Sequence, residues 1–268
     1  MKNWLKISSW MLLVLLLSTW TLAKEATLTE KEKKCFAENT SRVIVPSPSD
    51  LFCALDSVLG ADWTGQVSYN KKTDYKNYYL RALNIGVRSA NGFLAIQAKD
   101  KEALGGIIRT LLPIARALGV EETLLKRSDK FRKLAEQREW LRLRRELGKL
   151  KTTIESEMKR MGDDEIALLM STGGWLEGLR AVTDILRSKY DKKASDLLRQ
   201  PGIASYLGKK FKELEPGTLN DAMVKEIADK IPEIEKLINV DFGKPVPKEN
   251  VEKLFIISNK LIKKIERG

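Results

Sequence analysis

Carboxylates are the main side chains in this sequence that could perform chemistry, because the chain has no histidine. Histidine is the commonest general acid–base group and metal ligand, so its absence excludes Ser-His and Cys-His nucleophile pairs and haem attached through Cys-x-x-Cys-His. An enzyme using carboxylates alone would draw on Asp163, Asp164, Glu165 or Glu177. The first three follow Gly162 at an expected helix start, where acidic residues act as caps. We therefore expect no catalytic residue, no cofactor and no metal ligand.

Four polar residues share a narrow wedge of a helix whose remaining circumference is apolar. They are Arg81, Asn84, Arg88 and Asn91, and they recur at helical spacing. Polar groups inside a fold must find partners. The wedge therefore either hydrogen-bonds to neighbouring helices, with Arg88 against a carboxylate such as Glu177, or forms the polar wall of a pocket.

The position of Glu177 depends on the glycines of its own segment. Gly173 and Gly174 interrupt a helical pattern, where they could kink the helix or let another backbone come close. On a straight helix Glu177 lies away from the apolar stripe, which predicts an exposed carboxylate paired with Arg180. A kink would turn Glu177 inward, toward Arg88.

The two cysteines, Cys35 and Cys53, are separated by 17 residues. In an oxidising compartment this pair predicts a disulfide, which would contribute about 3 kcal/mol if it is unstrained. The alternative is two buried free thiols that behave as small apolar groups.

A basic ridge lies opposite an apolar stripe between residues 138 and 161. The ridge consists of Arg138, Arg142, Arg145 and Lys149. It is either a solvated charged face or, together with the basic residues of 260–267, a surface for an anionic polymer or a membrane. Trp140 lies on the packing side, so base stacking has little support and we do not expect nucleic acid as a partner.

The N-terminus has the layout of a secretory signal. Lys2 and Lys6 precede an apolar run from Ile7 to Trp20, and Ala23 is the expected last residue removed. This run is shorter than the roughly 20 residues that a membrane-spanning helix needs. Removal of 1–23 would lower Lys+Arg from 48 to 46 against 36 Asp+Glu, leaving a net charge of +10. We expect an exported protein, periplasmic or extracellular, without a transmembrane segment after cleavage.

The rest of the chain predicts an all-α bundle of about eight or nine helices without a sheet, because period-two alternation is not sustained anywhere. We expect one helical domain over 24–268, with possible sub-bundles 24–120 and 121–268. Only 42–45 looks extended. The expected helices cover 36–38, 49–60, 74–99, 101–118, 121–136, 138–161, 164–189, 192–214, 218–239 and 247–266.

Three blocks resemble an uncharacterised family of exported, all-helical bacterial proteins, many of which have lipoprotein signals. The blocks are Pro46–Phe52, Ala82–Leu94 and Ser171–Leu179. The sequence departs from that family by lacking a lipid-attachment cysteine and by having Arg88 and Arg180 where the family's pattern has an aromatic residue. The resemblance implies export and a helical fold, and it implies no activity.

The sequence thus leaves three functions open. The leading one is a non-enzymatic extracytoplasmic binding or scaffold protein of the cell envelope, whose partner is an anionic envelope component or another envelope protein. The second is a binder of anionic polymer or membrane surface through the basic helices. The third is an enzyme that uses carboxylates alone.

Overall fold

The described part of the chain, residues 48–241 and 243–268 of a computed structural model, is an all-α bundle, as predicted. It contains nine helices of seven or more residues and no strand. The longer helices are α3 (Pro48–Leu59), α4 (Tyr78–Gln97), α5 (Lys101–Ala117), α6 (Glu121–Glu136), α7 (Trp140–Arg160), α8 (Asp164–Ser188), α10 (Pro201–Lys212), α12 (Ala222–Ile238) and α13 (Lys248–Arg267). The described residues belong to one compact unit.

Local signals determine where these helices begin and end. Asn77 and Asp100 cap α4 and α5 by accepting backbone N–H groups of the first turn. Gly60, Gly119 and Gly162 follow α3, α5 and α7 and have positive φ, as helix-ending glycines do.

Two predicted helices are divided. The range 192–214 contains the short helix α9 (Lys192–Ser195), a 3₁₀ turn and α10, which begins at Pro201. The range 218–239 begins in another short helix, α11 (Pro216–Leu219), and Asp221 then caps α12. The predicted elements 36–38 and 42–45 lie outside the described residues.

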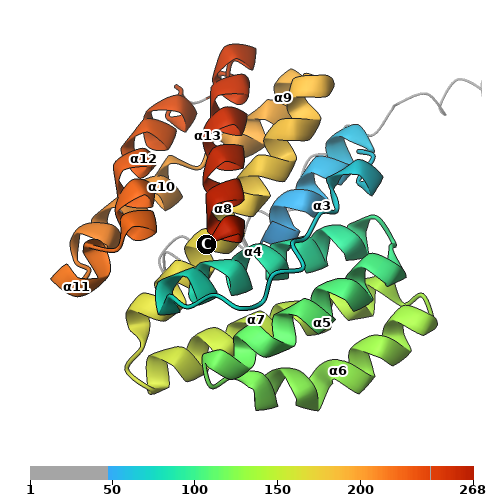
Figure 1. The fold of residues 1–268 in the computed structure, drawn as a ribbon. Helices are drawn as coiled ribbons and strands as arrows, with labels where there is room; N and C mark the ends of the chain where they lie inside the picture. The colour runs from blue at the N-terminus through green and yellow to red at the C-terminus, as the bar shows by residue number, and fades with distance from the viewer. Residues whose placement is uncertain (1–47, 242) are drawn as a thin grey trace, which may run out of the picture. The chain divides into compact units, whose positions relative to one another are not determined.

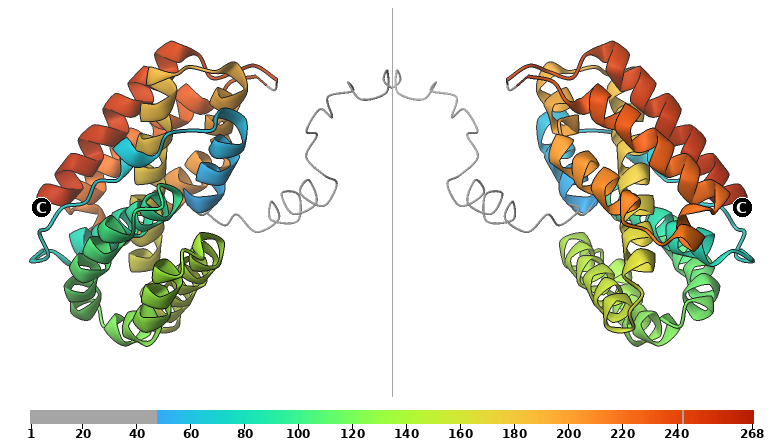
Figure 2. Two further views of the ribbon diagram at one scale, coloured as in Figure 1. Left: turned by 90° about the vertical axis from the view of Figure 1, so that its right-hand side faces the viewer. Right: turned by 90° about the vertical axis from the view of Figure 1, so that its left-hand side faces the viewer.

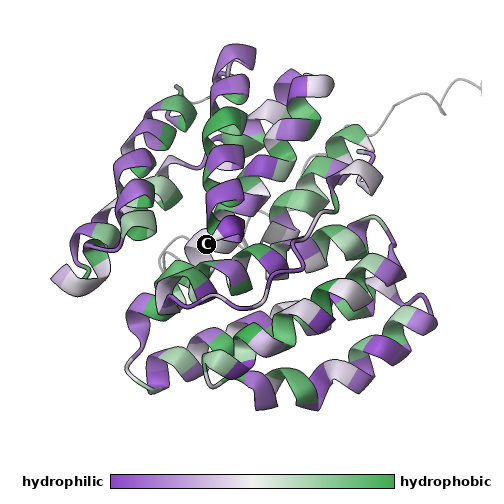
Figure 3. Ribbon diagram, viewed as in Figure 1, coloured by the Kyte–Doolittle hydropathy of each residue, from purple (hydrophilic) through white to green (hydrophobic). Residues whose placement is uncertain are grey.

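Helices α4 to α7 form an up-down four-helix bundle. Three-residue connections at 98–100, 118–120 and 137–139 make successive helices antiparallel neighbours, and α7 closes the ring by packing against α4. These helices are the teal, green and yellow-green elements of Figure 1. Apart from the polar wedge of α4 and Glu146 of α7, their buried sides are mainly apolar, and hydrophobic and hydrophilic residues alternate along the ribbon of α6 in Figure 3.

The most extensive helix contact joins α4 to α8. A Cβ atom on Gly86 would lie 1.9 Å from the carbonyl oxygen of Met170, and one on Gly173 would lie 2.2 Å from that of Leu83. The two backbones therefore touch where the helices cross. Helix α8 runs unbroken through Gly173 and Gly174, so these glycines provide close approach and do not break the helix. Figure 2 shows α8 beside α13 on the side of α4 away from α5 and α6, and α8 packs against both α4 and α13.

The segment 61–77, between α3 and α4, contains only a 3₁₀ turn at Thr64–Gln66. It nevertheless buries Trp63, Gln66 and Tyr75. Its Tyr69 hydroxyl would lie 1.7 Å from a Cβ on Gly106 of α5. The segment therefore packs closely on the bundle, and it covers the polar wedge of α4.

Candidate functional site

The polar wedge of α4 lies inside the fold. Asn84, Arg88 and Asn91 are buried, whereas Arg81 is partly exposed and donates from Nε to the carbonyl oxygen of Tyr75. The segment 61–77 and the C-terminal end of α13 lie over this wedge and supply most of its partners.

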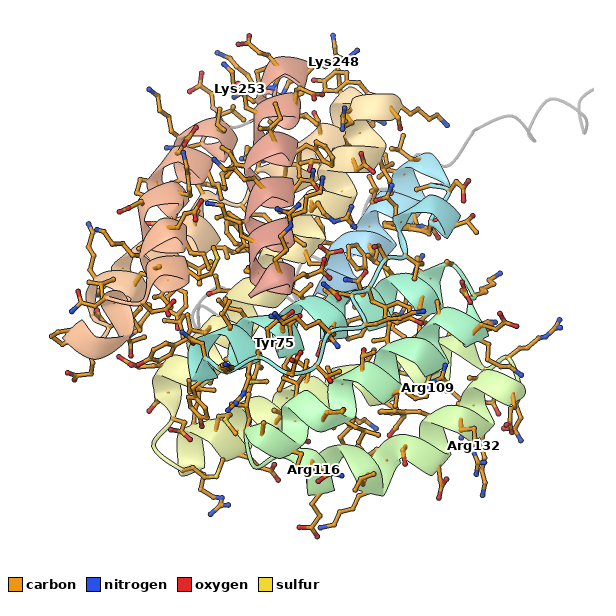
Figure 4. The ribbon with its side chains drawn as sticks, viewed as in Figure 1. Tyr75, Arg109, Arg116, Arg132, Lys248 and Lys253 are labelled. Atoms are coloured by element: carbon orange, nitrogen blue, oxygen red, sulfur yellow. The ribbon has the colours of Figure 1, made fainter. Side chains whose placement is uncertain are left out.

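Arg88 is fully buried, with an exposed fraction of 0%. Its Nη1 donates to the carbonyl oxygen of Thr110 at 3.0 Å, and its Nη2 donates to the carbonyl oxygen of Lys72 and to the Tyr75 hydroxyl. Tyr75 in turn donates to the carbonyl oxygen of Glu266 at 2.9 Å. Burial lowers the pKa of Arg88 below its ordinary value and raises that of Tyr75. Figure 4 labels Tyr75 beside the end of α13.

The predicted pairing of Arg88 with a carboxylate is wrong for the described residues. Its hydrogen bonds go to two backbone carbonyls and a phenol, because α5 and the segment 61–77 lie within its reach. Among the described carboxylates, Glu266 acts on Arg88 and raises the pKa of the guanidinium, but this effect is smaller than the lowering by burial.

The two asparagines tie other elements to α4. Asn84 Nδ2 donates to the carbonyl oxygens of Leu80 and Ile265, each at 2.8 Å, and so holds the end of α13. Asn91 Oδ1 accepts the backbone N–H of Ser68 at 3.2 Å. Both side chains therefore hydrogen-bond to backbone groups of neighbouring elements and hold those elements against α4.

Glu177 is buried, with an exposed fraction of 1%, and its partner is Arg180. Arg180 Nε and Nη2 donate to the two carboxylate oxygens at 2.9 and 2.8 Å. Burial raises the pKa of the Glu177 carboxyl above its ordinary value, and the bonds from Arg180 and Asn91 act in the opposite direction. The expected partner is thus correct, but the expected exposure is wrong: α8 crosses α4 so closely that this side of the helix is covered.

Three buried atoms in this region lack a hydrogen-bond partner among the described residues: Gln66 Oε1, Asn84 Oδ1 and Arg88 Nε. A cavity of about 20 Å³ borders Arg88 and the apolar side chains of α4 to α7. That volume accommodates about one water molecule. The wedge therefore faces packed protein, and this cavity is too small for a drug-sized ligand.

The other carboxylate candidates make structural contacts. Asp163 precedes α8, and Asp164 and Glu165 occupy its first turn, where they complement the helix dipole. Glu165 accepts the backbone N–H of Glu215 at 2.6 Å and the Thr218 hydroxyl, which joins α8 to α11. Among residues 48–241 and 243–268, no three Asp, Glu, Cys or His side chains gather as metal ligands would.

Cys53 lies on α3, partly buried beside the guanidinium of Arg144. Burial raises the pKa of its thiol. Cys35 lies outside the described residues, so the disulfide between Cys35 and Cys53 stays a prediction.

The basic ridge is exposed, as its spacing predicts. Arg138 lies in the turn before α7, and Arg142, Arg145 and Lys149 lie on the outer side of that helix. Arg142 pairs with Glu139 and Lys149 with Glu146. Glu146 also accepts from Lys130 at 2.8 Å, and these hydrogen bonds lower its pKa to about 2.

Sequence reasoning missed the segment 61–77, which supplies Ser68, Lys72 and Tyr75 to the wedge. It has no helical or strand periodicity, so its burial has no periodic signal. The one available hint is Trp63 and two tyrosines, Tyr69 and Tyr75, in a mostly polar stretch.

No family model, curated protein or solved structure matches this chain. The resemblance to an exported helical family therefore stays an expectation. Within the described residues, none of the helices combines the length and apolarity needed to cross a bilayer.

Proposed function

We propose that this protein is a non-enzymatic helical binding protein of the cell envelope, acting outside the cytoplasm, and that it binds an anionic envelope component through its outer surface. Export rests on the signal-like residues 1–23. Binding through the surface is favoured because the interior polar groups already bond to the protein's own backbone.

The observation that carries this proposal is the charge of the hairpin α6–α7. Residues 126–151 contain 11 Lys and Arg against 4 Asp and Glu, a net charge of +7. Most of these cations are exposed, including Lys126, Lys130 and Arg132 on α6 and the ridge on α7. Figure 4 shows Arg132 pointing away from the bundle. Such a surface attracts anionic partners and repels basic ones.

Affinity for a soluble anionic polymer tests this function. We expect the protein to bind immobilised polyphosphate, with an affinity that falls steeply as salt rises, because each neutralised phosphate releases a counterion. A variant with Lys126, Lys130 and Arg132 changed to Gln should bind more weakly and show a shallower salt dependence. Absence of salt-sensitive binding would overturn the proposal.

Location is tested separately. The protein recovered from the envelope or the medium should begin at Lys24. An intact mass that retains residues 1–23 in all fractions would contradict export with cleavage.

A further inference from the structure

The start of α7 combines exposed cations with an exposed leucine. We use the name "α7 face" for Arg138, Leu141, Arg142, Arg145 and Lys149. Leu141 is 67% exposed, more than any other large apolar side chain in the described part of the chain. The four cations of the face are all exposed.

Helix geometry gathers the four residues of the face that belong to α7 on one side, and Arg138 lies in the turn just before the helix. Leu141, Arg145 and Lys149 are spaced by four residues, so they lie one above the other, and Arg142 is adjacent. The opposite side of α7 packs into the bundle, and it consists of Leu143, Leu147, Leu150, Ile154 and Met158. Leu141 therefore contributes to the outer surface and not to the core.

Several local features at the start of α7 are unfavourable for its stability. Glu139 is the N-cap residue of α7 but makes no side-chain cap hydrogen bond, and no acidic residue lies in the first turn, whereas Arg142, Arg144 and Arg145 lie near this positive end. Cations at this end of a helix are unfavourable. Arg138 also has φ of 56°, a left-handed conformation that disfavours residues other than glycine. Residues that destabilise the local structure in this way are typical of functional positions.

Part of the charge on the face has no counter-charge among the residues that the structure describes. Arg142 pairs with Glu139 at 2.5 Å, and Lys149 shares Glu146 with Lys130. Within the described residues, Arg138 and Arg145 have no ion-pair partner. These two guanidinium groups are therefore available to phosphate oxygens, which arginine binds in bidentate geometry.

We infer that the α7 face binds the surface of a bilayer containing anionic phospholipid, with Arg138 and Arg145 on the headgroup phosphates and Leu141 entering the acyl boundary. This inference rests on the proposed function and names its partner. A soluble polyanion would satisfy the arginines but would leave Leu141 in water. A bilayer interface offers phosphates to the arginines and an apolar layer to Leu141, as it does for basic amphipathic helices that lie on membranes.

A second copy of the chain is a poorer occupant. Two copies related by a two-fold axis would bring this face against itself and place like charges opposite one another. Nucleic acid is also poorer, because the face carries no aromatic side chain for bases to stack on.

Vesicle binding tests the inference. The protein is purified in the form in which it accumulates in its producing cells, and it is mixed with vesicles of phosphatidylcholine with or without about one third phosphatidylglycerol. Flotation measures the bound fraction. We expect binding to the anionic vesicles, reduced by salt, and little binding to the neutral ones.

Matched variants locate the surface. Arg138→Gln with Arg145→Gln should lower vesicle affinity about 25-fold, at roughly fivefold for each arginine. The control variant, Lys192→Gln with Lys212→Gln, removes the same amount of charge from two exposed positions, the first residue of α9 and the last residue of α10. It should change vesicle affinity much less. Leu141→Ser should lower vesicle affinity roughly tenfold and leave polyphosphate binding unchanged. Thermal unfolding checks that each variant folds.

The outcomes separate this inference from the proposed function. Binding to polyphosphate without binding to anionic vesicles overturns the inference and leaves the function standing. Vesicle binding that the α7 variants and the control variants weaken equally also overturns it. Loss of binding to both probes overturns both.

Discussion

Glu177 and Arg180 form a bidentate ion pair inside the fold, with Oε1 2.8 Å from Nη2 and Oε2 2.9 Å from Nε. The carboxylate is buried, and the guanidinium also donates to the carbonyl oxygen of Gln66 at 3.3 Å. One helical turn of α8 thus supplies both the buried charge and its counter-charge, and the pair reaches the segment that covers α4.

Removing one partner of this pair should be strongly destabilising. Arg180→Met leaves the Glu177 carboxylate buried without its counter-charge, which we expect to lower the free energy of unfolding by about 3–5 kcal/mol. Adding Glu177→Gln should restore part of the loss, because the buried charge is then absent. Urea unfolding of the two single variants and the double variant measures this coupling.

Arg88 provides the control for that cycle. Its partners are Thr110, Lys72 and Tyr75, so Arg88→Met and Glu177→Gln should be additive within about 0.5 kcal/mol. A coupling as large as that between Arg180 and Glu177 would contradict the partners described for Arg88.

The helix crossing at Gly86 gives a second prediction. Alanine is a better helix former than glycine by about 1 kcal/mol, yet Gly86→Ala would place Cβ 1.9 Å from the carbonyl oxygen of Met170. Because the obstacle is backbone, α4 and α8 would have to separate, and we expect a loss of at least about 3 kcal/mol.

Gly148 is the matched control within a helix. A Cβ there has nothing within 4 Å, so Gly148→Ala should stabilise α7 by about 0.5–1 kcal/mol. Thermal unfolding of both variants decides the matter. Equal and small effects would mean that α4 and α8 do not touch at Gly86.

The sequence predicts the helices well because their signals are local. Capping by Asp100, the helix-ending Gly119 and the apolar spacing of α7 all depend on neighbouring residues, and each predicted the observed boundary closely. The role of Gly86 was also accessible, since glycine within a buried helix indicates close approach.

The partners of the wedge could not be predicted in the same way. Arg88 reaches Lys72 and Thr110 because of how the segment 61–77 and α5 lie on α4, and no periodic pattern encodes that arrangement. The burial of Glu177 likewise follows from the crossing of α4 and α8. These facts depend on tertiary packing, which overrides the helical wheel.

The pH dependence of stability should contain a contribution from Glu266. Burial raises the pKa of this carboxyl above its ordinary value of 4.5; Glu177 acts in the same direction, and Arg88 and Arg180 act in the opposite one. A raised folded-state pKa means that the folded form holds the proton more tightly than the unfolded form. The stabilisation is complete below the unfolded pKa and is lost as pH rises through the folded pKa.

Glu266→Gln removes that titration and imitates the protonated form. The variant and the wild type should therefore have similar stability below about pH 4.5, and the variant should become the more stable of the two toward neutral pH. Urea midpoints measured at intervals across this range provide the test. If the stability of the variant relative to wild type fell between acidic and neutral pH, the sign of the effect would be the opposite and the prediction would be refuted.

The turn at Arg138 gives the last prediction, in which stability and binding change in opposite directions. Its φ of 56° costs a non-glycine residue about 1 kcal/mol or more. Glycine avoids this cost but loses more conformational freedom on folding, so the substitution recovers only part of it. Arg138→Gly also removes a cation near the positive end of α7. We expect the free energy of unfolding to rise by about 0.5–1 kcal/mol. Lys99→Gly, at φ of 57° after α4, should give a similar gain.

Only one of these two variants alters the α7 face. Arg138→Gly should lower affinity for anionic vesicles about fivefold while it stabilises the fold, whereas Lys99→Gly should leave that affinity almost unchanged. Thermal unfolding and vesicle flotation on the same two preparations provide both measurements. Equal vesicle affinity in the two variants would show that Arg138 contributes nothing to binding, and its left-handed conformation would then be a property of the turn alone.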